Sequence, residues 1–190
     1  MYSWAIITGD TPTTTDAFSF RQSLGCFPTG VCLVTTVTES GKCEGMTINS
    51  FSSVSLDPPL ILWNIRNDAR SAYAFIGSRH FIVSVLAASQ RDLAQHFARS
   101  APDKFVKWEN EFEAGLGGCP RLRHSAATFE CATYSRYTEG DHTILLGRVD
   151  KHVRTTVPAI ILHQGQMGSL WDLAQSAADP RVGRGPESSI

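Results

Sequence analysis

The sequence predicts one domain that is mainly β: an antiparallel β-barrel with helices at its periphery. Runs of β-branched and apolar residues predict about six or seven strands, against about three helical segments. The strands do not alternate regularly with helices, which argues against a doubly wound parallel sheet. The chain has 190 residues, 42% of them hydrophobic, which is enough to bury the core of a single domain.

Three segments have the apolar spacing of helices. Asp16 is a candidate N-cap for the first helix, which we expect to end before Pro28. The second helix spans residues 68–78. The third begins at a Ser-x-x-Asp sequence, residues 89–92, which has the form of a capping box, and runs to about residue 99.

The predicted strands account for most of the remaining chain. Gly41 marks the turn between the first two, and Gly140 the turn of a long hairpin. Residues 101–124 are irregular and rich in Gly and Pro, and such excursions in compact domains are usually functional. We expect an arm at residues 1–15, the domain at 16–170 and a tail at 171–190. The strands are residues 31–37, 43–49, 60–65, 81–86, 128–137, 142–153 and 158–163.

Composition excludes several classes of protein. The formal net charge is −1, so the basic excess typical of nucleic-acid binding is absent. No apolar run approaches the ~18 residues of a membrane span. The first positive residue is Arg21, so no secretory signal is expected and we predict a cytoplasmic protein. Only 18% of residues are charged, which suggests that a partner covers part of the surface, most simply in a homodimer.

The five cysteines predict neither a disulfide framework nor a metal site. Their number is odd, none forms a CxxC pair, and none has zinc-type spacing to histidine. Cys32 and Cys131 lie within apolar strand-like runs, where a reduced thiol packs as a small hydrophobic group. Reduced cysteines agree with a reducing compartment.

The most informative stretch is the serine-rich run from Gly45 to Leu60, which contains a double proline near its end. Its hydroxyl, amide and backbone groups could hydrogen-bond a phosphate or the polar edge of a flavin ring. The alternative is a polar strand end followed by a Ser-rich turn. Thr29-Gly30, which fourteen residues separate from the start of this run, could bring backbone close to a flat ligand, or could be an ordinary turn.

Three further features are candidates for binding. The segment 64–71 follows a strand and opens a helix, so Arg70 and Ser71 could bind an anion there, or could cap a surface helix. His142 follows the hairpin turn and could contact a nicotinamide ring, although a lone histidine there is usually structural. Phe105, in the long excursion, could cover a planar ring or simply pack.

Taken in order, these segments resemble the flavin reductase-like, FMN-binding split-barrel family. The resemblance covers roughly residues 16–170, and its most specific part is the run from Asn49 to Pro59. The other matching segments are Phe27-Pro28-Thr29-Gly30-Val31, Gly45-Met46-Thr47, Ser71, Phe81 to Leu86, Gln90, Leu93-Ala94, Phe97, Lys104-Phe105, Gly140-Asp141-His142 and Pro158 to His163.

The resemblance implies a Greek-key-like split β-barrel homodimer that binds FMN, or FAD. His142 is the catalytic residue that it implies, on the nicotinamide side. Ile48 stands where a smaller residue is commoner, which adds bulk beside the flavin. The motifs and the resemblance together predict these cofactor-binding residues: Thr29, Met46, Thr47, Ile48, Asn49, Ser50, Ser52, Ser53, Asn64, Arg70, Ser71, Ser84, Val85, Leu86, Gln90 and Phe105.

The predicted activity is therefore hydride transfer from NADH or NADPH to FMN or FAD. The resemblance implies that the reduced flavin then serves a separate monooxygenase. Because the two cofactors carry the chemistry, no acid–base pair of side chains is needed. Two alternatives stay open: an enzyme with permanently bound FMN that acts on a small organic substrate, and a flavin-binding protein without catalysis.

Overall fold

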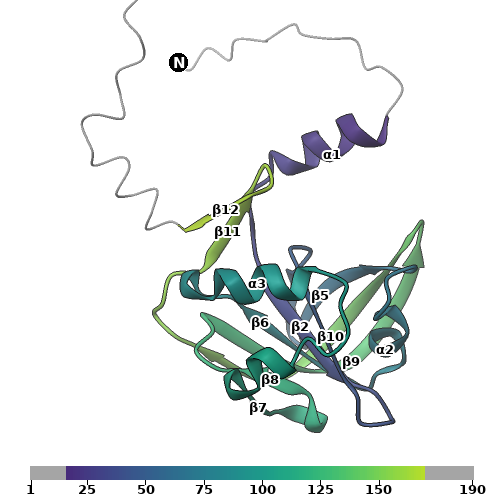
Figure 1. Ribbon diagram of the computed structural model, residues 1–190. Coiled ribbons are helices and arrows are strands. Elements are labelled where there is room, and N and C mark those ends of the chain that lie inside the picture. The colour runs from purple at the N-terminus through teal and green to yellow at the C-terminus, as the bar shows by residue number, and fades with distance from the viewer. Residues whose placement is uncertain (1–15, 170–190) are drawn as a thin grey trace, which may run out of the picture.

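The computed structural model describes residues 16–169 as three α-helices and three sheets (Figure 1). The predicted arm and tail lie outside the described residues. The helices are α1 (Ala17–Gly25), α2 (Ala72–Gly77) and α3 (Arg91–Ala98). The strands are β1 (Thr29–Gly30), β2 (Cys32–Val37), β3 (Cys43–Ile48), β4 (Ser52–Leu56), β5 (Pro59–Arg66), β6 (His80–Val85), β7 (Phe112–Ala114), β8 (Pro120–Leu122), β9 (Ala127–Glu139), β10 (His142–Arg154), β11 (Ile160–His163) and β12 (Gln166–Ser169).

The main sheet has seven antiparallel strands in the order β3-β2-β6-β9-β10-β5-β4. All seven predicted strands are confirmed, and so is the hairpin of β9 and β10, which turns at Gly140 with φ +57°. Five short strands are additional to the prediction: the edge strand β4 in the main sheet, and β1, β7, β8 and β12 in the two smaller sheets.

The sheet curls into a split barrel because its two edge strands are adjacent in sequence. β3 and β4 lie at opposite edges, yet only residues 49–51 join them. Four extended Cα–Cα steps span at most about 14 Å, so these two edges must approach each other at this end. The predicted fold class, a mainly β split barrel with peripheral helices, is confirmed.

The core forms on both faces of the curled sheet. Along β2, Cys32 and Val34 belong to one cluster, with Trp63 and Phe81, whereas Leu33 belongs to the other. This division follows from the period of two in a strand, whose successive side chains point to opposite faces. The second cluster lies beneath α3, which contributes Leu93, Ala94 and Phe97. Leu93, Ala94 and Phe97 are thus the buried residues of α3.

The helices agree with the prediction in place but not in every detail. Asp16 caps α1, since its carboxylate accepts the amide N–H groups of Phe18 and Ser19 at 2.9 Å. The second helix is shorter than predicted. The expected capping box at Ser89 is wrong: α3 begins at Arg91, and the Gln90 side chain accepts the amide of Ala87 instead.

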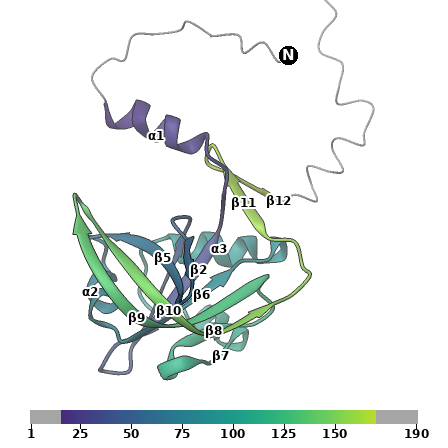
Figure 2. The same ribbon diagram turned by 180° about the vertical axis from the view of Figure 1, so that it is seen from behind.

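The C-terminal part of the described chain forms a small second sheet, in the order β1-β11-β12. This sheet and α1 project from one end of the barrel (Figure 1, Figure 2). None of the residues of α1 is buried. The large apolar side chains of α1 and its exit, all more than half exposed, are Phe18, Phe20, Leu24 and Phe27.

All five cysteines are free and three of them are buried, including Cys32 and Cys131, which were predicted to be reduced core residues. Burial raises the pKa of the Cys32 and Cys131 thiols to about 12. Both thiols therefore behave as small core groups. Among residues 16–169, no helix is long and apolar enough to cross a membrane, and no group of three or more His, Cys, Asp or Glu side chains is placed to hold a metal ion.

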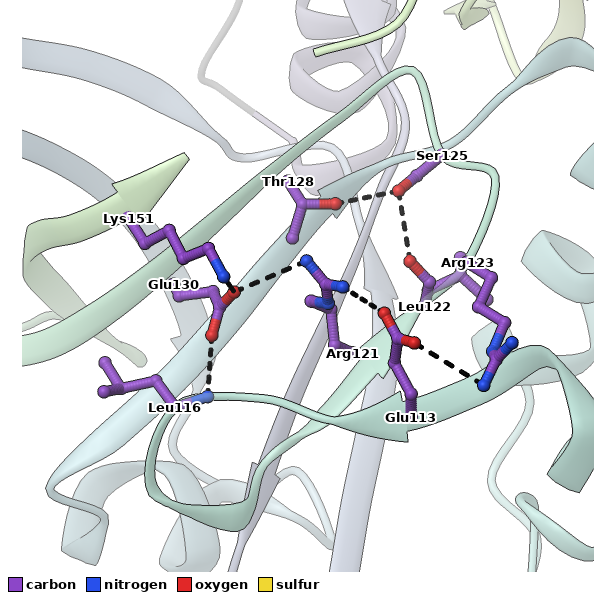
Figure 3. Close-up of polar contacts among 9 residues, drawn as sticks. All are labelled: Glu113, Leu116, Arg121, Leu122, Arg123, Ser125, Thr128, Glu130 and Lys151. Atoms are coloured by element: carbon purple, nitrogen blue, oxygen red, sulfur yellow. Dashed lines mark hydrogen bonds and ion pairs between the residues drawn. The ribbon is translucent and has the colours of Figure 1, made fainter. Parts of the chain in front are cut away.

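The excursion predicted at residues 101–124 is anchored to the sheet by a network of charges (Figure 3). Glu130, on β9, is 5% exposed and accepts the amide N–H of Leu116 at 2.7 Å. Its other oxygen lies 3.7 Å from Arg121 and 3.8 Å from Lys151. Arg121 also pairs with Glu113 across the β7–β8 ribbon. The excursion is thus tied to β9 at both η3 (Leu116–Gly118) and β8.

We predict that Glu130→Ala destabilises the protein by about 2 kcal/mol, because the Leu116 amide, Arg121 and Lys151 lose the acceptor that they share. Urea unfolding followed by circular dichroism measures the loss. Glu113→Ala is the matched control: its side chain is 32% exposed, against 7% for Glu130, so its loss should be much smaller. Equal losses for the two variants would contradict the anchoring role of Glu130.

Candidate flavin and nucleotide site

A cavity of about 350 Å³ lies between three segments that are distant in sequence. The first is β3 with the residue before it, the second is the turn 69–71 before α2, and the third is the segment 97–106, which comprises the end of α3 and the residues after it. We call this cavity the main pocket because predicted residues line it; a larger cavity of about 540 Å³, beside His80 and Gly117, contains none of them. Of the residues predicted from the sequence, the main pocket brings together Met46, Thr47, Arg70, Ser71 and Phe105.

Gly45 is the residue that lets the far wall approach β3. A Cβ atom at this position would lie 2.9 Å from Cζ of Phe105 and 3.1 Å from Cε1 of Phe97. Phe97, Phe105 and Phe112 pack edge to face, with ring centroids 5.0 to 5.8 Å apart. This aromatic cluster fixes the wall that carries Phe105.

Lys104 joins the same wall to β3. Its ammonium donates to the Gly45 carbonyl at 3.2 Å and to the Phe97 carbonyl at 3.1 Å. Partial burial lowers the pKa of Lys104. An ammonium has three hydrogens, so one remains for a ligand. The prediction from sequence did not assign Lys104, although its place beside Phe105 in the matching motif was a signal.

The backbone of β3 has an open edge along the pocket. β3 pairs only with β2 in the described structure, and the Gly45 carbonyl faces away from β2 because it accepts from Lys104. The N–H and C=O of one residue in an antiparallel strand point to the same side. Gly45 and Thr47 therefore direct their amide N–H groups outward, where a ligand could accept them.

The main pocket carries an excess of positive charge. Its lining includes Lys42, Arg70, Arg99 and Lys104, against the carboxylates Glu44 and Asp103. Lys42 and Glu44 form an ion pair with each other. The remaining cations and the hydroxyl of Ser71 suit a phosphate group. The Ser71 hydroxyl lies 3.8 Å from the sulfur of Met46, a weak contact that a phosphate could replace.

A smaller cavity of about 190 Å³ lies at the other end of β3, between α1 and the β11–β12 turn. It contains two more predicted residues, Thr29 and Asn49. The Thr29 hydroxyl is buried and has no hydrogen-bond partner. A buried polar group without a partner is costly, so this hydroxyl is suited to a ligand atom. β3 and its exit thus connect two cavities.

His142 lies outside both cavities, at the first position of β10, opposite Arg66 on β5. Its Nδ1 is 2.7 Å from the Asp141 carboxylate. This contact lowers the pKa of Asp141. With Nδ1 held, Nε2 is directed away from Asp141. The structure therefore does not bring His142 together with the predicted residues of either cavity.

Ser50 and Asn64 have structural partners. The Ser50 hydroxyl accepts the amide N–H of Asn64 and donates to its carbonyl, both at 3.1 Å. This pair ties residues 49–51 to β5. Similarly, the Thr47 hydroxyl donates to the carbonyl of Ala94 on α3 at 2.7 Å. These hydroxyls are committed to the fold, which leaves the backbone of the same residues for a ligand.

The remaining predicted residues lie away from the two cavities. Ser52 and Ser53 are exposed on the edge strand β4, and Gln90 bonds to the Ala87 amide and the Arg123 carbonyl. Val85 is half-buried. Three more have core side chains with little exposure: Ile48 at 7%, Ser84 at 1% and Leu86 at 0%. The expectation that the bulk of Ile48 lies beside the flavin is not supported by this placement.

Comparison with known proteins identifies the class of protein. Residues 24–170 match the family described as flavin reductase like domain. This match covers most of the chain, so the chain belongs to that family. The resemblance found in the sequence is therefore confirmed.

The chain is similar to several characterised members. It is 44% identical over 133 residues to the FMN reductase (NADH) SmoA of Agrobacterium fabrum, covering 69% of this chain and 73% of that protein. It is 38% identical to the stachydrine N-demethylase reductase subunit Stc3 of Rhizobium meliloti, covering 70% of this chain. The chain spans only 57% of the length of Stc3.

A solved structure has the same fold. It is the NADH:FAD oxidoreductase SgcE6 of Streptomyces globisporus in complex with NAD and FAD fragments. The TM-score is 0.78 at 32% identity, over 95% of this chain and 100% of that one. The split-barrel fold is thus shared along almost the whole length of SgcE6.

Proposed function

We propose that the protein is an NAD(P)H-dependent flavin reductase that uses FMN or FAD. The observation that carries this proposal is the convergence of five predicted residues, from three distant segments, on one cation-rich pocket. Membership of the flavin reductase like family supports the same activity. The names of SmoA and SgcE6 support NADH as the reductant, and FMN and FAD respectively as the flavin.

The phosphate end of the flavin is assigned to Arg70, Ser71 and the free N–H of Lys104. These groups offer charge and hydrogen-bond donors, and the turn that carries two of them is held by α2 and β5. Ser52 and Ser53 are exposed on β4, so they can contact the flavin only if it extends to this open edge of the barrel.

The ring and ribityl chain are assigned to the open edge of β3 and to the two cavities at its ends. The outward amides of Gly45 and Thr47 supply donors, and Thr29 supplies a buried hydroxyl that lacks a partner. Phe105 and Met46 are apolar groups that exclude water from a flat ring. Ile48 and Val85 pack in the same cluster as Met46, and Leu86 packs in the cluster that includes Phe105.

When both cofactors are bound, the flavin accepts the hydride that the nicotinamide gives up. The protein contributes orientation rather than a proton: Asp141 holds the His142 ring, and Nε2 is left to contact the nicotinamide side. The outward amides of β3 stabilise negative charge on the flavin ring. In this assignment His142 is the catalytic residue.

The reduced flavin is proposed to serve a separate monooxygenase in the cytoplasm. Stc3 is named as the reductase subunit of a demethylase, which supports a two-component arrangement. Exchange of flavin between proteins requires an accessible site, and the main pocket opens to the surface next to the exposed residues Arg70 and Arg99.

The activity is tested by NADH or NADPH oxidation with purified protein. We expect oxidation of at least one nucleotide to depend on added FMN or FAD, because the flavin is the hydride acceptor. Anaerobic mixing of flavin-loaded protein with each nucleotide, followed by flavin absorbance, gives the nucleotide preference. If neither nucleotide reduces the flavin, the assignment fails; tight binding without turnover would indicate a binding protein instead.

His142→Ala should lower the rate of flavin reduction by roughly tenfold to a hundredfold, because the nicotinamide loses its orientation. Flavin affinity, measured by fluorescence titration, should stay within a few-fold of the wild-type value. His163→Ala, at an exposed histidine of β11, is the control and should change neither quantity. Loss of flavin affinity at an unchanged reduction rate would refute the role of His142.

We also propose that the protein is a homodimer. Helix α1 has no buried residue. Its side chains Phe18, Phe20 and Leu24, and Phe27 just after it, are each more than half exposed. Such a concentration of exposed apolar side chains is unfavourable for a monomer. Because α1 projects with the second sheet beyond the barrel, it can reach a second copy (Figure 2).

Sedimentation velocity tests the dimer. The wild type should sediment at twice the chain mass of 20.8 kDa, and Phe20→Ser/Leu24→Ser should shift the population toward monomer, since it removes apolar contact area. Lys107→Ser/Glu109→Ser, at exposed positions of the excursion, is the control. A wild type that is monomeric at tens of micromolar would exclude this use of α1.

A further inference from the structure

The hairpin end that carries His142 is held by a loop from another part of the chain. The amide N–H of Asn67 donates to the carbonyl of Asp141 at 2.9 Å. The hydroxyl of Thr143 donates to the side-chain oxygen of Asn67 at 2.7 Å. Asn67 is thus hydrogen-bonded to the residues immediately before and after His142.

Thr143 fixes this contact from inside the barrel. It is 3% exposed, lies opposite Ile65 on β5 and Thr138 on β9, and has its hydroxyl 3.3 Å from that of Thr138. Successive side chains of a strand point to opposite faces, so the buried Thr143 sets the backbone from which His142 projects. By contrast, the contact with Asp141 orients only the imidazole ring of His142. The Asp141 side chain is 77% exposed, so it does not fix the backbone.

Asn67 also belongs to the turn that ends in the main pocket. The turn is tight: the Ala69 amide donates to Arg66 at 3.1 Å, and the Ala72 amide donates to Ala69 at 2.8 Å. Arg70 and Ser71, three and four residues after Asn67, line the pocket. One short rigid turn therefore connects the hairpin of His142 to the cationic wall.

We infer that Asn67 and Thr143 are positioning residues, which set the place of His142 relative to the main pocket. This inference rests on the proposed function, in which His142 and the pocket act on the same pair of cofactors. Misplacement of a catalytic group by about 1 Å can cost roughly a hundredfold in rate. A hairpin end held at two points on one loop prevents such a shift.

Four variants separate positioning from folding. Thr143→Val removes the donor and keeps the side-chain shape, and Asn67→Ala removes the acceptor. Thr143→Ser keeps the hydroxyl and is the conservative variant. Asn110→Ala makes the same change at an exposed asparagine in η2 (Val106–Glu111), and serves as control. Asn67 is itself exposed, so in Thr143→Val water can hydrogen-bond to its side-chain amide, and the fold should persist.

Thr143→Val and Asn67→Ala should each lower kcat for NAD(P)H oxidation about tenfold or more, with KM for flavin within twofold, because the loss concerns the transition state. Thr143→Ser and Asn110→Ala should keep the wild-type kcat. The double variant Asn67→Ala/Thr143→Val should have a kcat no lower than that of either single variant, because both substitutions remove the same hydrogen bond. An unchanged kcat in Thr143→Val, or an equal loss in Thr143→Ser, would overturn the inference.

Hydrogen exchange provides a readout that needs no activity. In the flavin-free protein, the Asn67 amide should exchange at least tenfold faster in Thr143→Val than in the wild type, because its bond to Asp141 loosens. Amides of β2 should be unchanged. If the wild type lacks flavin-dependent NAD(P)H oxidation, the proposed function fails. An unchanged exchange rate of the Asn67 amide in Thr143→Val would separately refute the positioning role of Asn67 and Thr143.

Discussion

The constraint on which the fold depends is the short connection between the two edges of the main sheet. Residues 49–51 must join β3 to β4 across the seam of the barrel, so the sheet has to curl. Ser50 holds this connection by bonding to both backbone groups of Asn64. In the described structure the seam leaves β3 with an unpaired edge. The main pocket is lined by β3, and the smaller cavity lies at the exit of that strand, at Asn49.

The sequence predicted the elements that have a clear physical signal. Buried strands such as β2 and β6 are β-branched and apolar, and β9 and β10 share an obvious turn at Gly140. The edge strand β4 was not predicted because four of its five residues are exposed. Its mixture of serine and apolar residues therefore lacks the buried apolar face that indicates a strand in a sequence. Its pairing is set by β5 rather than by its own residues.

The site was predictable in its segments but not in the orientation of its side chains. The residues at 46, 47, 70, 71 and 105 do converge, which spacing and family motifs could indicate. What sequence could not give was the face of β3 to which each side chain points. Ile48 lies with Val34 and Trp63 in the core, and Thr47 bonds to α3. Lys104 was missed because its neighbours, Gly45 and Phe97, become close only in the fold.

These placements change what the serine-rich run contributes. Its strand part uses most side chains for packing: Met46 and Ile48 face the barrel core, whereas Gly45 admits Phe105 from the other face. What a flavin would meet along β3 is therefore mainly backbone, and every residue type except proline supplies the same amide there. Recognition at such an edge depends on strand position more than on side-chain identity. It follows that substitution of Ile48 acts on core packing first and on the ligand only through displacement of β3.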